Sequence, residues 1–238
     1  MKDPKIQEIK KFYETNSDPE IIKKYSRYFR DGYDGYGIDK DLAEKQITGW
    51  IERWKGEMNI DRWLDLGDEL FRNGRYDEKH LAIRFIMTQR EHYSKETFNR
   101  IGKWFDYGVN NWATTDVLCM TVLTDLMVDH VIDLNDLKSW NDTESEWQRR
   151  AVPVTLIELV KKGMEPDDAL NTIKPLMPDK SEYVQKGIGT LLREIWKKHP
   201  GVIEDFLMEW KDSCGRLIVQ YATEKMDKEY RKRFRKSK

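Results

Sequence analysis

The segment Arg149-Arg150-Ala151-Val152 is matched 36 residues later by Gln185-Lys186-Gly187-Ile188, with polar and apolar residues in the same order. Both segments show helical periodicity, and similar periodicity recurs along the chain. Longer helices are expected to begin at Asp77, Trp112, Trp147 and Tyr183. These starts are 35, 35 and 36 residues apart, and one shorter helix fits between each pair. A fixed period of this length, filled by one helical hairpin, is typical of a helical repeat array.

Turn residues separate the expected helices, and no run shows the period-2 alternation of a strand. Helices are expected at residues 4–15, 19–30, 39–54, 59–73, 77–92, 95–107, 112–129, 144–162, 166–176, 181–198, 200–212 and 216–234. The sequence therefore predicts an all-α fold, a right-handed α-solenoid of HEAT-like two-helix repeats. It predicts a single domain over residues 1–238, with N-terminal helices at 1–56 and the repeat array at 57–238.

The charge of the chain is nearly balanced. Charged residues make up 36% of it, yet the formal net charge is only −1. Because phosphate neutralisation dominates affinity for nucleic acid, a chain that wraps DNA is usually basic overall. DNA binding therefore requires that the positive side chains gather on one face.

Several functional classes lack any signal. Cys119 and Cys214 have no metal or redox spacing, and the absence of a disulfide framework agrees with a reducing cytoplasm. The four histidines are scattered, so no metal site is expected. The sequence contains no phosphate-binding loop that would indicate a nucleotide cofactor. No cofactor of any kind is expected. The chain has no signal peptide and no apolar run of membrane-spanning length, which predicts a soluble, cytoplasmic protein without a membrane partner.

The repeat period places residues of different helices side by side. Asp116, Arg150 and Lys186 occupy nearly equivalent places on three consecutive long helices. Equivalent helices of a solenoid line one concave wall, so a carboxylate is expected beside two cations. One interpretation is a ladder of salt bridges between repeats, and the other is a functional surface.

Three segments carry a family resemblance. They are Asn111-Trp112-Ala113-Thr114-Thr115-Asp116, Trp147-Gln148-Arg149-Arg150-Ala151, and residues 183–194 with the sequence YVQKGIGTLLRE. In type, order and interval they resemble the AlkD family of DNA alkylation-repair glycosylases. Residues 25–38 also resemble the N-terminal part of relatives in this superfamily, less specifically.

The resemblance implies a DNA glycosylase that removes N3- and N7-alkylated purines from duplex DNA. Such bases carry a positive charge, which weakens the N-glycosidic bond, and their departure leaves an oxocarbenium-like sugar. The family is thought to act without extruding the base into a pocket, unlike most glycosylases. The enzyme is expected to need no cofactor and to act as a monomer.

The candidate catalytic residues suit this chemistry. Trp112 and Asp116 are four residues apart and share one helical face, where an aromatic ring beside a carboxylate can receive a developing sugar cation. Arg150, one repeat later, is expected to hold a phosphate next to the lesion. In the alternative interpretation Trp112 packs in the core, Asp116 caps a helix start and Arg150 bridges repeats. The residues expected to contact DNA are Arg149, Lys186, Arg193, Gln185 and Thr190.

The sequence departs from the family pattern at one place. Thr190 stands where AlkD has a bulky aromatic residue that helps form its cleft. Two further functions therefore stay open: a non-catalytic HEAT-like relative that binds branched or damaged DNA, and a HEAT-type scaffold for protein interactions.

Overall fold

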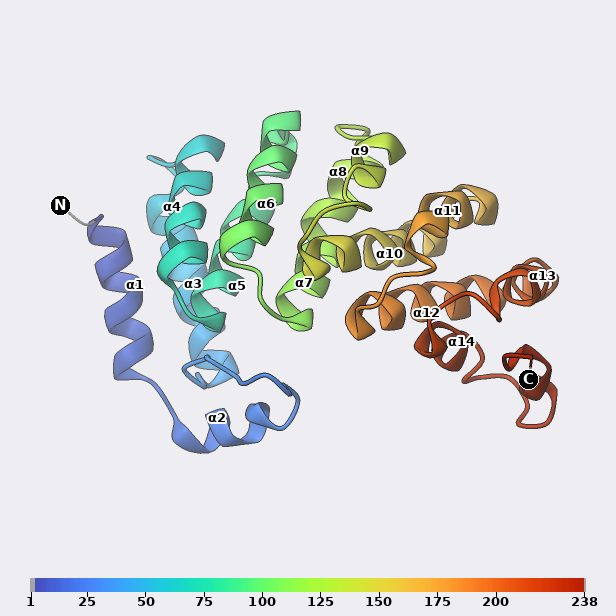
Figure 1. Ribbon diagram of the computed structural model, residues 1–238. Helices are drawn as coiled ribbons and strands as arrows, with labels where there is room; N and C mark the ends of the chain where they lie inside the picture. The colour runs from blue at the N-terminus through green and yellow to red at the C-terminus, as the bar shows by residue number, and fades with distance from the viewer. Residues whose placement is uncertain (1–2, 238) are drawn as a thin grey trace. The chain divides into compact units, whose positions relative to one another are not determined.

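The computed structural model describes residues 3–237, and every regular element in that range is helical (Figure 1). The α-helices are α1 (Pro4–Thr15), α2 (Pro19–Ser26), α3 (Lys40–Trp54), α4 (Ile60–Asn73), α5 (Tyr76–Met87), α6 (Lys95–Tyr107), α7 (Trp112–Leu118), α8 (Thr124–Val128), α9 (Leu134–Lys138), α10 (Glu146–Lys161), α11 (Pro166–Ile173), α12 (Glu182–Trp196), α13 (Pro200–Trp210) and α14 (Arg216–Ala222). The chain is an all-α helical repeat protein, as its sequence predicts.

Helix starts follow the capping chemistry of the sequence. Asp18 precedes Pro19, and its carboxylate accepts the amide of Glu20 at 2.8 Å. Ser181 precedes α12, and its hydroxyl accepts the amides of Tyr183 and Val184 at 3.2 and 3.4 Å. Each cap satisfies amides that have no partner inside the first turn of the helix.

The long helices recur at the expected period. Helices α5, α7, α10 and α12 begin at residues 76, 112, 146 and 182, so their starts are 36, 34 and 36 residues apart. This agrees within one residue with the intervals expected from the sequence. The chain divides into two compact units at residues 117 and 118, and the prediction of one domain over 1–238 stays a prediction. Residues 1, 2 and 238 lie outside the described part.

The first unit is built around large aromatic side chains. Helix α4 packs against α5 and α6, and these helices lie side by side in Figure 1. Between them the rings of Phe71 and Trp104 stack at 4.1 Å, and those of Trp63 and Phe85 lie 4.4 Å apart. Gly67 makes room for this core, since a Cβ there would lie 2.8 Å from Trp104 Cζ2. Removing one such ring costs about 3–5 kcal/mol of unfolding free energy.

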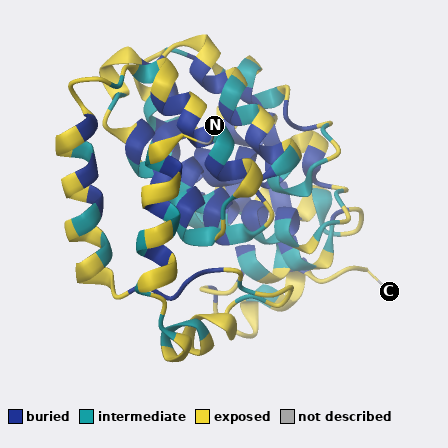
Figure 2. Cartoon of the chain, turned by 90° about the vertical axis from the view of Figure 1, so that its left-hand side faces the viewer, coloured by how far each residue is buried: buried dark blue, intermediate teal, exposed yellow. Residues whose placement is uncertain are grey.

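The second unit contains a stack of three helices, α10, α12 and α14. Helix α10 packs against α12, and α12 packs against α14. The contact between α12 and α14 is close because Gly189 lacks a side chain: a Cβ there would lie 2.6 Å from Tyr221 Cβ and 2.8 Å from the Ile218 carbonyl oxygen. In both units the buried residues face neighbouring helices and the exposed ones face outward (Figure 2).

Several boundaries differ from those expected. The helix expected at 112–129 contains a π-helical turn at Cys119–Leu123, where the Thr124 hydroxyl donates to the Cys119 carbonyl at 2.7 Å. The short α9 was not expected. The helix expected at 216–234 ends at Ala222, and a 3₁₀ turn follows at Tyr230–Phe234. No helix within residues 3–237 is long and apolar enough to cross a membrane.

Candidate active site

Trp112 and Asp116 lie one turn apart on α7, in the first unit. Asn111 fixes the start of this helix, because its side-chain oxygen accepts the Thr114 amide at 2.9 Å and its carbonyl accepts the Thr115 hydroxyl at 2.9 Å. Trp112 and Asp116 are both half-buried. The spacing of four residues therefore places an indole and a carboxylate on one partly open helical face, as expected from the sequence.

Trp112 is the end of an aromatic cluster, which we define as Tyr25, Phe29, Tyr33, Tyr76 and Trp112. The ring of Phe29 stacks on Trp112 with centroids 5.7 Å apart and planes 22° from parallel. Phe29 also contacts Tyr33 at 5.0 Å and Tyr76 at 5.6 Å, and Tyr33 contacts Tyr25 at 6.0 Å. The indole Nε1 of Trp112 donates to the backbone carbonyl preceding Phe29 at 3.3 Å. Trp112 is thus held from two sides by a segment that lies more than 80 residues earlier in the chain.

Helix α5, which supplies Tyr76 to the cluster, carries polar groups whose pKa values are shifted toward the neutral form by burial. Burial lowers the pKa of His80 to about 4, and its Nε2 lies 3.2 Å from Thr114 Oγ1. Burial also raises the pKa of the Asp77 carboxyl, although the Tyr36 amide donates to it at 2.6 Å. The pKa of Tyr76 rises to about 12 for the same reason. The ring of Tyr76 lies 4.1 Å from His80, so α5 supports the cluster with two contacting side chains that are uncharged at neutral pH.

Arg150 belongs to the second unit and is largely buried at 8% exposure. Its Nη1 donates to the Tyr183 carbonyl at 2.6 Å, which joins α10 to the first turn of α12. Gly187 leaves room for the guanidinium, since a Cβ there would lie 3.6 Å from Arg150 Nη1. The ring of Trp147 packs 4.5 Å from Tyr183 beside it. The expectation that Arg150 bridges neighbouring repeats is therefore met, whatever else it contacts.

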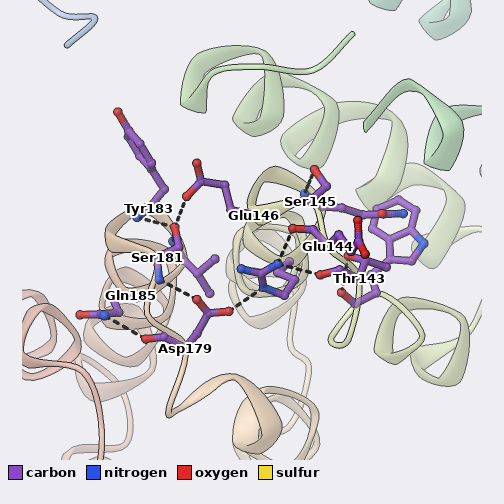
Figure 3. Close-up of polar contacts among 12 residues, drawn as sticks. Thr143, Glu144, Ser145, Glu146, Asp179, Ser181, Tyr183 and Gln185 are labelled. Atoms are coloured by element: carbon purple, nitrogen blue, oxygen red, sulfur yellow. Dashed lines mark hydrogen bonds and ion pairs between the residues drawn. The ribbon is translucent and has the colours of Figure 1, made fainter. Parts of the chain in front are cut away.

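Arg149 and Gln185 lie in a polar network that connects α10, α12 and α14. Figure 3 shows the part of this network around Asp179, Ser181 and Gln185. Arg149 donates through Nε to Asp179 at 2.6 Å and through Nη1 to the carbonyls of Thr143 and Glu144 at 2.6 and 2.8 Å. The amide nitrogen of Gln185 donates to the Asp179 carbonyl at 2.9 Å. Its oxygen accepts the first-turn amide of α14 at 3.3 Å.

The other residues expected to contact DNA also have partners inside the unit. Arg193 pairs with Glu224 at 2.5 Å and with Glu194 at 3.2 Å. Lys186 pairs with Glu182 at 3.5 Å and lies over the Tyr183 ring, 5.5 Å from its centroid. The Thr190 hydroxyl donates to the Lys186 carbonyl at 2.8 Å within α12.

The structure thus brings together Trp112 and Asp116 in the first unit, and Arg149, Arg150, Gln185 and Lys186 in the second. Sequence reasoning missed Phe29, Tyr33 and Tyr76 as site residues. The aromatic and glycine-rich composition of residues 25–38 was a signal for Phe29 and Tyr33. Which of the expected residues contact DNA stays a prediction.

Known proteins resemble this chain in sequence profile and in fold. The sequence profile of a family described as "DNA alkylation repair enzyme" matches residues 9–226. No curated protein matches the sequence significantly.

Solved structures show the same fold. The protein described as "Predicted DNA alkylation repair enzyme from Enterococcus faecalis" superposes with a TM-score of 0.75 at 17% identity, covering 90% of this chain and 98% of its own. The smu.31 protein of Streptococcus mutans UA159 gives 0.60 at 20% identity, covering 87% of this chain and 100% of its own. AlkD2 of Streptococcus mutans gives 0.59 at 19% identity, covering 87% and 98%.

Proposed function

The chain belongs to the DNA alkylation repair enzyme family, and from this premise we propose that it is a DNA glycosylase that hydrolyses the N-glycosidic bond of N3- or N7-alkylated purines in duplex DNA. The observation that carries the proposal is the Trp112–Asp116 pair on one partly open face of α7, with Trp112 held by the aromatic cluster.

In the proposed reaction the bond between C1′ and the base nitrogen breaks first. The bonding pair leaves with the base, which becomes neutral, and the positive charge passes to the sugar. The carboxylate of Asp116 stabilises that charge, and an electrostatic contact of this kind is among the largest single contributions to a rate. A water molecule then adds to C1′ and releases a proton, which leaves an abasic site and the free purine.

Trp112 and Arg150 are assigned supporting roles. The indole of Trp112 packs against the sugar and excludes bulk water, and its electron-rich face favours a cationic neighbour. Stacking on Phe29 fixes the indole before DNA binds, so little ordering is needed during the reaction. Arg150 positions a phosphate near the lesion through its planar guanidinium. Lys186 and Arg193 are assigned to more distant phosphates.

A second function rests on one specific residue. Thr190 supplies no aromatic surface, and its hydroxyl already donates within α12. A relative that binds damaged or branched DNA without excising the base is therefore the alternative. A protein-interaction scaffold would have no use for a carboxylate beside a fixed indole.

Single-turnover release of 7-methylguanine from duplex DNA tests the proposal. Asp116→Asn should lower the rate on the order of a hundredfold, about 3 kcal/mol, while duplex affinity stays nearly unchanged. The matched control is Asp106→Asn, an exposed carboxylate on α6, which should excise like the wild type. Equal rates for Asp116→Asn and the wild type would exclude the catalytic role of Asp116. DNA binding by a wild type that releases no base would establish the non-catalytic alternative.

A further inference from the structure

The C-terminal end of the second unit contains a cavity of about 740 Å³ lined mainly by α14 and the 3₁₀ turn at Tyr230–Phe234. Five of the nine lining residues are cationic, and none is acidic. The cationic ones are Lys211, Arg216, Arg231, Arg235 and Lys236. Volumes of roughly 300–1,000 Å³ are typical of sites for small molecules, whereas a duplex is too wide to enter such a space.

Most of these cations are not neutralised by the protein. Lys211 is the exception, since it pairs with Asp212 at 3.5 Å and donates to the Ser237 hydroxyl at 2.9 Å. Within residues 3–237 no ion pair joins Arg216, Arg231, Arg235 or Lys236 to a carboxylate.

One acidic neighbour, Asp227, interacts with the lining residue Arg231. Asp227 is fully exposed, and its pKa is lowered mainly by the amides of Tyr230 and Glu229, at 3.0 and 2.8 Å, with the charge of Arg231 a lesser cause. The cations of α12 differ sharply, because Arg193 lies between two carboxylates. Cations gathered around a concave site attract an external anion, because the site concentrates their positive potential.

The cavity is held in shape by the chain that follows it. The Ser237 amide donates to Asp212 at 2.6 Å, and Lys211 donates to the Arg235 carbonyl at 3.4 Å. These contacts fasten Arg235 and Lys236 to the segment after α13. The backbone that carries these two cations is thus held in place before a ligand arrives, which lowers part of the entropic cost of binding.

The interior of the cavity is less polar than its rim. Thr223 is buried, and its hydroxyl already donates to the Val219 carbonyl at 2.8 Å. Phe234 is also buried, and Val219 is half-buried. The rim suits a phosphate, because arginine guanidinium groups bind its oxygens in pairs, and their flat faces stack on nucleobases.

We propose that this cavity binds a nucleotide through its phosphate, supplied either as a free nucleotide or as the phosphorylated end of a nucleic acid strand. The proposal is independent of base excision, since none of its residues belongs to the candidate active site.

Calorimetric titration of the full chain with adenosine 5′-monophosphate, and with adenosine as the matched probe, tests the proposal. The monophosphate should bind at least about tenfold more tightly, since each charge-assisted hydrogen bond contributes roughly 1.5–3 kcal/mol. The double variant Arg216→Gln/Arg235→Gln should lose that preference. The control Lys228→Gln removes an exposed cation of the same segment that does not line the cavity, and it should bind like the wild type.

A second titration separates the two sources of the nucleotide. If a single-stranded oligonucleotide with a 5′-phosphate binds more tightly than the same oligonucleotide without it, the ligand is a strand end. If only the monophosphate binds, the ligand is a free nucleotide. If the double variant fails to fold, as judged by its thermal transition, the single variant Lys236→Gln takes its place. Equal affinity for adenosine and its monophosphate, or no change in either variant, would overturn the proposal.

Discussion

Substitution of Arg149 separates a structural role from a DNA-binding one. In Arg149→Met three hydrogen bonds disappear, to Asp179 and to the carbonyls of Thr143 and Glu144. The Asp179 side chain is only 8% exposed, so its carboxylate is left without its cation away from water. Breaking a buried pair on one side destabilises a protein by about 3–5 kcal/mol. For a chain of this size that is a fall of roughly 6–20 °C in Tm.

Urea and thermal unfolding measure this loss of stability, and two further variants serve as controls. Lys186→Met breaks a largely solvent-accessible pair between half-buried Lys186 and exposed Glu182, and surface pairs contribute about 0–1 kcal/mol. The double variant Arg149→Met/Asp179→Leu should recover part of the lost stability, because it removes the stranded charge as well.

Duplex affinity measured well below the lowered Tm completes the test. If the guanidinium serves mainly to join α10 to the segment before α12, Arg149→Met should bind DNA nearly as well as the wild type. A variant of unchanged stability that binds DNA at least about tenfold more weakly would refute the structural reasoning and make Arg149 a phosphate contact.

Further predictions concern the aromatic cluster, the histidine behind it, the packing of α12 and the DNA interface. Phe29→Ala should slow single-turnover excision about fivefold, since one aromatic contact on Trp112 contributes roughly 1 kcal/mol; an unchanged rate would show that the indole needs no support. His80 has a folded-state pKa of about 4 against an ordinary 6.5, so its stabilising contribution is full above pH 6.5 and is lost as the pH falls toward 4. His80→Phe should flatten the stability profile in that interval, and an unaltered slope would contradict the assignment. Gly189→Ala should destabilise by about 1–3 kcal/mol because its Cβ would lie 2.8 Å from an α14 carbonyl oxygen, whereas Gly201→Ala, which meets no atom within 4 Å, should not. Duplex affinity should fall as salt rises, and a salt-insensitive or undetectable interaction would favour the scaffold.

The sequence predicted where the helices begin better than where they end. Starts depend on local caps such as Asp18 and follow the repeat period, and both can be read directly from the sequence. Ends depend on tertiary surroundings. The helix expected to continue to residue 234 ends at Ala222, and Asp227 then accepts two amides of the turn that follows. The short α9 has its own signal, a reciprocal cap between Asp133 and Asp136, which is easily overlooked because the helix has only five residues.

The site was predictable only where its geometry is local. Trp112 and Asp116 share a face because they are four residues apart on one helix. Phe29 and Tyr76 could not be assigned to the same cluster, because they lie 83 and 36 residues before Trp112 and meet through folding. The partners of the expected phosphate contacts were hidden for the same reason: Arg193 and Glu224 are 31 residues apart.

These carboxylate partners help to reconcile a net charge of −1 with a proposed DNA-binding function. Lys186 and Arg193 both lie in ion pairs, so contact with a phosphate would exchange one anion for another. A released carboxylate would take up a cation from solution, which offsets part of the counterion release from DNA. In a plot of log affinity against log salt concentration, an unpaired cation contributes a slope of about 0.9 in magnitude for each phosphate that it contacts. A cation that is already ion-paired should therefore contribute a smaller slope. Glu224→Gln, which frees Arg193 from one partner, should steepen that slope, and an unchanged slope would show that Arg193 does not reach DNA.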